Sequence, residues 1–235
     1  MREIERREPP EPELLESEAD KLNFLMLSER MFYPDRHHPD SQAQRLAKRR
    51  LHSDEKSGVK FFALKDGGAI VAGGSLRIQD RSGLRIALLT DNFTIPELRG
   101  EAYSNKITTE RLRWAAEQGC YAAEANVRTD NPTALAAKLK NGFNVTSLPP
   151  SLRQGSTRSF KIYKNLRLPA TTDLTSSETA YQPEWEEIPL SDLDTIRHRL
   201  RSGWLGIDVK NAGKKESSDP QDWVLILEKN APTLH

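Results

Sequence analysis

The sequence has a single cysteine, Cys120, and no long apolar run. One cysteine excludes an internal disulfide framework and leaves no Cys-x-x-Cys pair for zinc or redox chemistry, so we expect no metal. No apolar stretch approaches the length needed to cross a bilayer, and no secretory signal pattern opens the chain. We therefore expect a cytoplasmic protein without a membrane partner.

The chain also lacks a charge imbalance and an internal repeat. Its 35 basic and 34 acidic residues nearly cancel, which gives no argument for a nucleic-acid partner. The 235 residues are enough for one domain of ordinary size with an appendage.

Composition divides the chain into three parts. Residues 1–20 hold three prolines and eight acidic against three basic side chains, which predicts a disordered arm over residues 1–17. Threonine, serine and aspartate dominate the stretch after Leu168 and predict a linker. The remaining tail, within residues 169–235, contains three of the four tryptophans, a helix start at Ser191 and the strand-like DWVLILEK. A domain over residues 18–168 lies between arm and tail.

Residue spacing predicts the elements of that domain. Asp66, Gly67 and Gly68 separate two apolar runs and favour a tight antiparallel hairpin. A later helix is framed by Asn131 as its N-cap, by a proline at its first position and by Gly142 after its last turn. The predicted order is helix (from residue 18 to before Pro34), helix (41–58), strands (59–65, 69–78 and 84–95), helix (105–118), strand (121–127), helix (132–141) and strands (143–148 and 157–166). The strand at 121–127 lacks polar punctuation, which suggests burial on both faces.

The stretch PELRGEAYSNKIT, residues 96–108, leads from a strand into a helix. A helix N-terminus carries unpaired N–H groups and a partial positive charge, so small residues ahead of it allow the backbone to wrap a phosphate. Gly100, Ala102 and Ser104 are small at alternate positions, and Arg99 adds a cation. An ordinary strand-to-helix turn also favours glycine and serine, so the pattern alone leaves both interpretations open.

Together, residues 96–100, the following helix, the stop at Gly119, the next strand, Asn131 and Gly142-Phe143 resemble the central motifs of the GNAT family, the acetyl-CoA-dependent N-acetyltransferases. The resemblance covers residues 18–168. It implies an α/β (α+β) fold with a mixed, mostly antiparallel central sheet flanked by helices, here with a C-terminal extension. It also implies an acyl-CoA-dependent N-acyltransferase, which moves an acetyl group from acetyl-CoA, or another acyl group from its CoA thioester, to an amine by direct attack in a ternary complex.

The resemblance assigns roles to individual positions. Backbone groups of the strand would bind the pantetheine arm, backbone N–H groups of the turn would bind the pyrophosphate, and an asparagine at the next helix would contact the cofactor. These residues are Asn92, Phe93 and Thr94, then Arg99, Gly100, Glu101, Ala102, Tyr103, Ser104 and Asn105, and finally Asn131. Simple N-capping is the alternative for Asn131.

The sequence departs from the family pattern at several positions. Ala102 and Ser104 stand where the family usually has glycines, and their side chains would narrow the phosphate-binding turn. Lys138 replaces a tyrosine that protonates the departing thiolate in many members. A lysine can donate a proton, although a solvated lysine is the alternative. Asn126 replaces a glutamate base of some relatives, and an amide cannot take a proton from an ammonium group.

Other residues are candidates for the missing base. Glu124 shares a strand face with Asn126, and Asp91 adjoins the strand that would bind the pantetheine. His37 and His38 titrate near neutrality, although an exposed polar loop is the alternative for this pair. The candidate catalytic residues are therefore Glu124, Asp91 and Lys138.

Two other functions stay open. The first is that of the N-acyl amino acid and acyl-homoserine lactone synthases, which take longer acyl chains from CoA or acyl carrier protein; basic residues 45–50 would contact an acidic carrier, or form a solvated face. The second is a non-catalytic GNAT-fold protein that binds or regulates a partner through its tryptophan-bearing tail. The acceptor and the oligomeric state, a homo-oligomer included, stay open as well.

Overall fold

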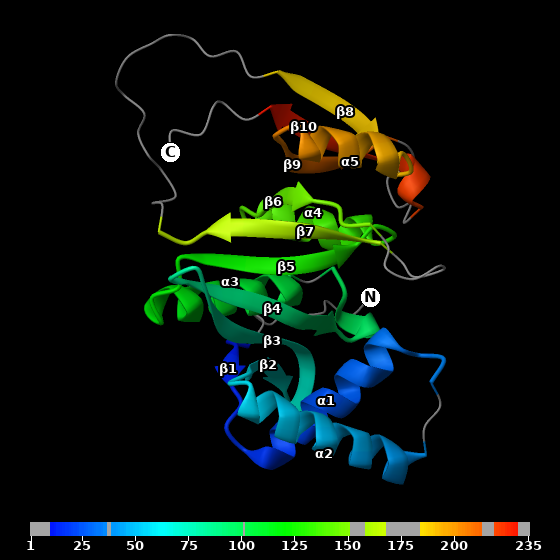
Figure 1. Cartoon of the computed structure of the whole chain (residues 1–235). Helices are drawn as coiled ribbons and strands as arrows, with labels where there is room; N and C mark the ends of the chain where they lie inside the picture. Colours follow the sequence, from blue (N-terminus) through cyan, green and yellow to red (C-terminus); the bar gives the residue numbers. More distant parts are fainter. Residues whose placement is uncertain are drawn as a thin grey trace. The chain divides into compact units, whose positions relative to one another are not determined.

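The computed structural model describes residues 10–36, 39–100, 102–150, 158–167, 184–212 and 219–229 (Figure 1). The chain forms two compact units, residues 1–119 (unit 1) and residues 120–235 (unit 2). Each unit combines mostly antiparallel strands with flanking helices, which confirms the predicted mixed α/β fold class.

The described residues of unit 1 form four strands in the order β1-β2-β3-β4, and each neighbouring pair is antiparallel. Its elements are β1 (Glu13–Leu14), α1 (Glu18–Phe32), α2 (Asp40–Lys56), β2 (Lys60–Asp66), β3 (Ala69–Arg81), β4 (Leu84–Thr94), the short 3-10 helix η1 (Pro96–Leu98) and α3 (Tyr103–Glu117). The two helices before β2 and the hairpin follow the prediction, and Gly67 and Gly68 have the positive φ angles that its turn requires.

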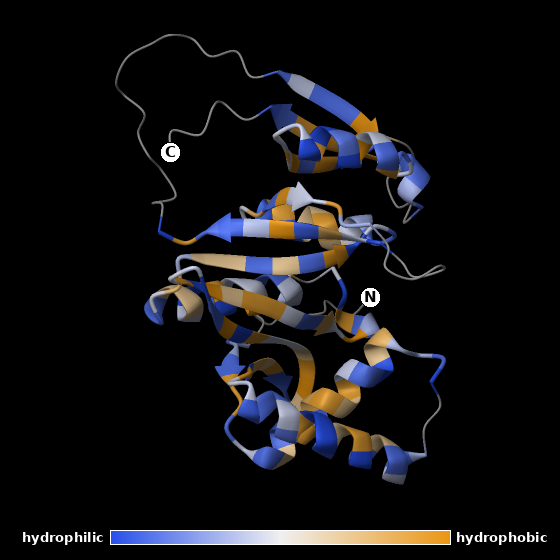
Figure 2. Cartoon of the chain, viewed as in Figure 1, coloured by the Kyte–Doolittle hydropathy of each residue, from blue (hydrophilic) through white to orange (hydrophobic). Residues whose placement is uncertain are grey.

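The helices of unit 1 cover opposite faces of its strands. Phe61 and Phe62 are neighbours on β2, so their side chains point to opposite faces. Phe61 packs against Phe24 of α1 with ring centroids 5.2 Å apart, whereas Phe62 packs against Trp114 of α3 at 5.9 Å. Figure 2 shows apolar and polar residues interspersed along α1 and α2, as expected for helices with one buried side.

In the part of unit 2 that the structure describes, six strands follow the order β5-β7-β6-β9-β10-β8, again antiparallel between neighbours. Its elements are β5 (Ala122–Arg128), α4 (Pro132–Lys140), β6 (Asn144–Ser147), β7 (Ser159–Asn165), β8 (Trp185–Pro189), α5 (Leu193–Arg201), β9 (Trp204–Asn211), the 3-10 helix η2 (Pro220–Asp222) and β10 (Trp223–Lys229).

Within unit 2, strand β9 of the C-terminal extension pairs with β6. Gly206 lies opposite Val145 in this pair, and a Cβ atom at Gly206 would stand only 2.8 Å from the Cβ of Val145. The close approach of the two strands therefore depends on this glycine. The helix predicted from Ser191 and the strand DWVLILEK are confirmed as α5 and β10, whereas β8 and β9 were not predicted.

Two expectations need correction. Within the arm predicted for residues 1–17, Glu13 and Leu14 pair with β2, and Leu15 is buried, because this apolar segment finds an open strand edge. The predicted burial of both faces of β5 is also wrong, since Asn126 and Arg128 on one face are exposed. Among the described residues, no helix is both long and apolar enough to span a bilayer.

Candidate functional site

Strand β4 contains a bulge at the candidate pantetheine-binding segment. Phe93 pairs with Gly73 and Thr90 pairs with Ser75, so two residues of β4, Asp91 and Asn92, stand against one of β3. Asp91 has a φ angle of 51°, an uncommon value for a residue with a side chain. A bulge of this kind disrupts the ladder of hydrogen bonds locally and redirects the side chains beside it.

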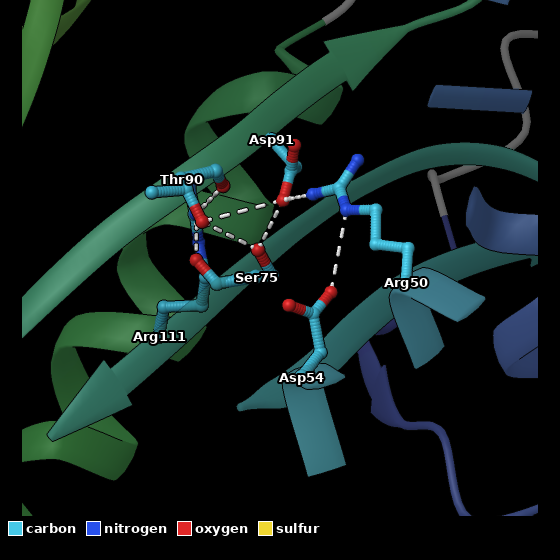
Figure 3. A network of polar contacts seen from close by, with 6 residues as sticks. All are labelled: Arg50, Asp54, Ser75, Thr90, Asp91 and Arg111. Atoms are coloured by element: carbon cyan, nitrogen blue, oxygen red, sulfur yellow. Dashed lines mark hydrogen bonds and ion pairs between the residues drawn. The ribbon is translucent and has the colours of Figure 1, made fainter. Parts of the chain in front are cut away.

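The carboxylate of Asp91 is the centre of a polar network on this bulge (Figure 3). Its Oδ2 accepts hydrogen bonds from Arg50 Nη2 at 2.6 Å, Ser75 Oγ at 2.7 Å and Thr90 Oγ1 at 3.3 Å. Burial alone would raise the pKa of Asp91, but these hydrogen bonds and the charge of Arg50 outweigh it and lower the pKa below its usual value. The carboxylate is thus held in its ionised form.

Arg50 lies between two carboxylates. Besides Asp91, its Nε approaches Asp54 Oδ2 on the next turn of α2 at 3.3 Å. Burial raises the pKa of Asp54, and the nearby charge of Arg50 offsets part of this rise. The ion pair between Arg50 and Asp91 therefore connects α2 to the bulge of β4.

Arg111 of α3 reaches the same bulge from within the core. Its side chain is fully buried, and its Nη1 donates to the carbonyl oxygens of Ser75 and Thr90, both at 2.9 Å. Nη2 donates to Asn92 Oδ1 at 2.6 Å, and Nε donates to the Ile107 carbonyl at 3.3 Å. Burial lowers the pKa of Arg111, which the charge of Asp91 partly opposes. Sequence analysis missed this residue, because an arginine at helical spacing ordinarily indicates a solvated face.

The side chain of Asn92 connects the bulge to the start of α3. While its oxygen accepts from Arg111, its Nδ2 donates to Ser104 Oγ at 2.6 Å. Both polar atoms of the Asn92 side chain are thus engaged in hydrogen bonds within the protein. Two residues further on, Thr94 Oγ1 is buried and receives no hydrogen bond from any described residue.

The N-terminus of α3 differs from most other helix starts in the chain. Ala102, its N-cap residue, has a φ angle of 62°, and Gly100 before it has a φ angle of 89°. Among the described residues, no side chain caps α3 and its first turn holds no acidic residue, whereas side chains of Ser17, Asn131 and Asp192 cap α1, α4 and α5. Within the described part of the chain, the backbone dipoles at this end are therefore not neutralised by a capping side chain.

The predicted phosphate-binding residues lie at this helix start. Arg99, Gly100, Ala102 and Asn105 are exposed, and Tyr103 is buried, where it anchors the first turn. Glu101 lies outside the described residues, as do His37 and His38. Lys106, also in the first turns of α3, pairs with Glu11 at 2.9 Å.

In unit 2, Asn131 and Lys138 belong to α4. Asn131 Oδ1 accepts a hydrogen bond from the Ala134 N–H at 3.0 Å, which confirms the predicted N-cap. Lys138 is buried rather than solvated, and its ammonium lies 6.0 Å from the ring centroid of Phe143.

Glu124 lies on a polar face of β5 and β7. It pairs across the strands with Tyr163, while Asn126 pairs with Lys161, so these four residues share one face. Glu124 Oε2 lies 3.3 Å from Lys161 Nζ, and the glutamate side chain is only 12% exposed. Burial, together with neighbouring Tyr121 and the charge of Glu124, raises the pKa of Tyr163.

The structure thus groups the candidates by unit: Asp91, Asn92 and Ser104 share one network in unit 1, and Glu124, Asn131 and Lys138 belong to unit 2. Among the described residues, no cluster of three histidine, cysteine or acidic side chains could hold a metal ion.

Comparison with known families places the chain. The model of the acetyltransferase (GNAT) family matches residues 21–143, a little over half of the sequence, and the chain therefore belongs to this family. A search of curated proteins finds no significant match.

Solved structures with the same fold include the ribosomal-protein-alanine N-acetyltransferase from Brucella melitensis, at 13% sequence identity and a TM-score of 0.51, with 65% of this chain and 99% of that chain covered. A GNAT-family acetyltransferase from Desulfovibrio desulfuricans has 12% identity and a TM-score of 0.52, with 66% and 98% covered. A chimaeric spermidine N-acetyltransferase built partly from the Vibrio cholerae protein has 15% identity and a TM-score of 0.52, with 66% and 96% covered. At these identities the likeness concerns the fold.

Proposed function

We propose that the protein is an N-acyltransferase that moves an acetyl group from acetyl-CoA to an amine by direct attack in a ternary complex. The observation that carries this proposal is the start of α3, which follows the bulged strand β4 and has no side-chain cap and no acidic residue in its first turn. A helix end of this kind favours a bound anion, and the pyrophosphate of CoA supplies one.

The residues around this helix start fit a CoA thioester. Gly100 and Ala102 both adopt left-handed backbone angles, and a Cβ atom at Gly100 would meet nothing within 4 Å. Ala102 is exposed, which argues against obstruction of the turn by its methyl group. The buried, unpaired hydroxyl of Thr94 suits an amide of the pantetheine arm.

The reaction needs a neutral amine and a polarised thioester. The amine nitrogen attacks the carbonyl carbon, the C–S bond breaks, the amine loses a proton and the CoA thiolate gains one. We assign the first proton transfer to Glu124, directly or through water. Its position supports the role, because the glutamate side chain is only 12% exposed and lies on the same strand face as Asn126, which replaces the glutamate base of some relatives. Asp91 is less suited, because its carboxylate accepts three hydrogen bonds and its pKa is lowered, which makes it a weaker base.

We assign Lys138 to the departing thiolate. Its burial supports this role, because an ammonium group in a low-dielectric environment stabilises a developing negative charge more than a solvated one does. A tyrosine hydroxyl performs this step in relatives, so a lysine would serve as an alternative acid.

Calorimetry with CoA and acetyl-CoA, followed by a thiol-release assay with a panel of primary amines and amino-terminal peptides, tests the proposal. We expect binding, and turnover with at least one amine. Glu124→Gln and Lys138→Met should each lower kcat by about 10²-fold without changing CoA affinity, whereas the exposed Lys140→Met on the same helix should leave both unchanged. Absence of CoA binding at millimolar ligand would exclude the function, and binding without turnover would favour a regulatory GNAT-fold protein.

One observation favours a longer acyl donor on acyl carrier protein as a second candidate. Arg45, Lys48 and Arg49 are exposed along α2, and within the described part of the chain no ion pair neutralises them. Exposed Leu46 lies beside them. An acidic carrier surface fits this stripe. Charge reversal at all three cations should then abolish turnover of acylated carrier but not of acetyl-CoA, and product from acetyl-CoA alone would exclude the carrier.

A further inference from the structure

The buried guanidinium of Arg111 lies in a core that consists mostly of apolar side chains. All of its described hydrogen bonds end on neutral oxygens, namely three carbonyls and one side-chain amide. A charge buried without a directly bonded carboxylate carries a large desolvation penalty. A leucine or methionine would fill the same space without this desolvation penalty. The arginine must therefore have a role other than filling the core.

The hydrogen bonds show what the guanidinium holds. Ser75 and Thr90 are directly opposed in the β3–β4 pair, and one nitrogen of Arg111 donates to both of their carbonyls. The ladder is interrupted here, because the bulge begins at the next residue of β4. Arg111 therefore supplies, from a side chain, the donors that a regular partner strand would supply.

The facing strand makes room for this arrangement. Gly74 stands opposite the bulge, and a Cβ atom there would lie 2.5 Å from the Cζ of Arg111. Any other residue at this position would displace the guanidinium. The guanidinium of Arg111 can therefore occupy this position only because residue 74 has no side chain.

A second cation holds the bulge from the other face. Ser75 pairs with Phe61 and Gly74 pairs with Phe62, so the side chain of Ser75 points toward α1 and α2 while Gly74 faces α3. Arg50 and Ser75 bind the Asp91 carboxylate on the first face, and Arg111 binds the strand carbonyls on the second. The bulge is fixed between the two (Figure 3).

The network continues to the phosphate-binding end of α3. Arg111 Nη2 orients the Asn92 side chain, whose Nδ2 in turn donates to Ser104 Oγ in the first turn of the helix. The bulged strand and the open helix end are therefore held in one fixed geometry by contiguous hydrogen bonds. These are the two segments of unit 1 that would bind the pantetheine and the pyrophosphate.

We infer that Arg111 is a positioning residue for the acyl-CoA donor: through the bulge carbonyls and the Asn92–Ser104 bridge, it fixes β4 and the start of α3 at the spacing that one CoA molecule requires. This inference rests on the proposed function. It concerns donor binding, and it assigns Arg111 no contact with substrate.

The test compares Arg111→Lys, which keeps the charge but loses the planar fork, with Ser104→Ala, which breaks only the last link of the bridge. Arg113→Lys is the matched control, because Arg113 lies on the exposed side of α3 and pairs with Glu110 and Glu117. Calorimetry gives the Kd for CoA, steady-state kinetics give KM for donor and acceptor separately, and amide hydrogen exchange reports on residues 88–94.

We expect Arg111→Lys to raise Kd and KM for the donor about tenfold, with faster exchange in β4 and an unchanged KM for the acceptor. Ser104→Ala should act in the same direction with a smaller effect, and Arg113→Lys should change nothing. The smaller change in Ser104→Ala keeps the test valid if Arg111→Lys folds poorly.

A fall in melting temperature with the donor Kd unchanged in both variants would assign Arg111 to stability alone and overturn the inference. An equal rise of KM for donor and acceptor would overturn it too, because it would indicate general loosening. If the wild-type protein itself binds no CoA, the proposed function fails first, and that result is visible before any variant is compared.

Discussion

Two strand-to-helix junctions of the molecule, β5–α4 (the closed junction) and β4–α3 (the open junction), are built in opposite ways. At the β5–α4 junction, Asn131 caps the helix, Pro132 fills its first position, and Leu135 and Leu139 bury its inner side. At the β4–α3 junction the helix begins at a left-handed alanine without a side-chain cap, and the strand before it is bulged and held by buried polar groups.

The difference concerns how each junction treats the backbone groups at its helix start. The β5–α4 junction satisfies its own donors and gains stability from apolar packing. At the β4–α3 junction the N-cap residue of α3 makes no side-chain capping hydrogen bond, and Arg111 and Asp91 hold the irregular backbone of β4. Two similar motifs are thus stabilised by different means, capping and apolar packing in one and buried polar contacts in the other.

The largest effect is expected where the closed junction depends on its core. Leu135 is fully buried, so Leu135→Ala should lower the free energy of unfolding by about 2–5 kcal/mol through lost burial and a residual cavity. Chemical denaturation of the variant checks this, with exposed Thr133→Ala as the control. A loss of unfolding free energy no larger than that of the control would show that apolar packing does not stabilise the β5–α4 junction.

A smaller effect is expected at the open junction from Asp91→Asn. Loss of the charged acceptor should lower stability at pH 7 by about 1–3 kcal/mol. Because the pKa of Asp91 is lowered in the folded state, the contribution is complete above the pKa of an unfolded aspartate, about 4, and is lost as the pH falls through the folded value. The difference between wild type and variant should therefore shrink below about pH 4.

Denaturant titrations from pH 7 to pH 3 measure this difference, with Glu97→Gln as an exposed carboxylate control. A difference that stays constant down to pH 3 would mean that the ionised carboxylate does not stabilise the bulge.

The N-cap of α4 gives the next effect. Asn131→Ala removes the acceptor for the Ala134 N–H and should lower stability by about 1 kcal/mol. Thermal melting of Asn131→Ala beside Asn131→Asp, which keeps the cap, separates the hydrogen bond from other consequences of the change. Equal melting temperatures for all three proteins would show that this junction is not closed by its cap.

The smallest effect is expected at Ala102. A left-handed conformation costs an L-residue roughly 1–2 kcal/mol, and the greater flexibility of glycine in the unfolded chain offsets about half of the gain on replacement. Ala102→Gly should therefore raise stability by less than about 1 kcal/mol. A lower melting temperature for this variant would show that the alanine methyl group contributes packing at the helix start, contrary to its exposure.

Local signals in the sequence were sufficient to predict the family and most of the helices and strands. Asp66, Gly67 and Gly68 specify a hairpin through their backbone preferences, and Asn131 with Pro132 specifies a helix start, so neither depends on distant residues. The motif order that predicted the GNAT family is likewise contiguous in the sequence, and the family is confirmed.

The features that support the candidate site depend on distant partners and were not predictable in this way. Nothing in the spacing of Arg111 distinguishes it from a surface arginine; only Gly74, far away in the sequence, makes room for it. The bulge at Asp91 adds one residue to a strand whose apolar pattern is otherwise continuous. Burial of Lys138 likewise follows from the packing of α4, which its own position in the sequence does not reveal.

The pairing of β9 with β6 has a consequence for solubility. A short strand such as β6 at the end of a sheet offers unpaired N–H and C=O groups to other chains, and β9 covers them. The strand order of unit 2 ends instead at β8, which carries Glu186, Glu187 and Pro189. Charges and proline on a terminal strand discourage cross-chain addition and aggregation. Removal of the extension should therefore leave β6 as an exposed edge strand that can pair with other chains.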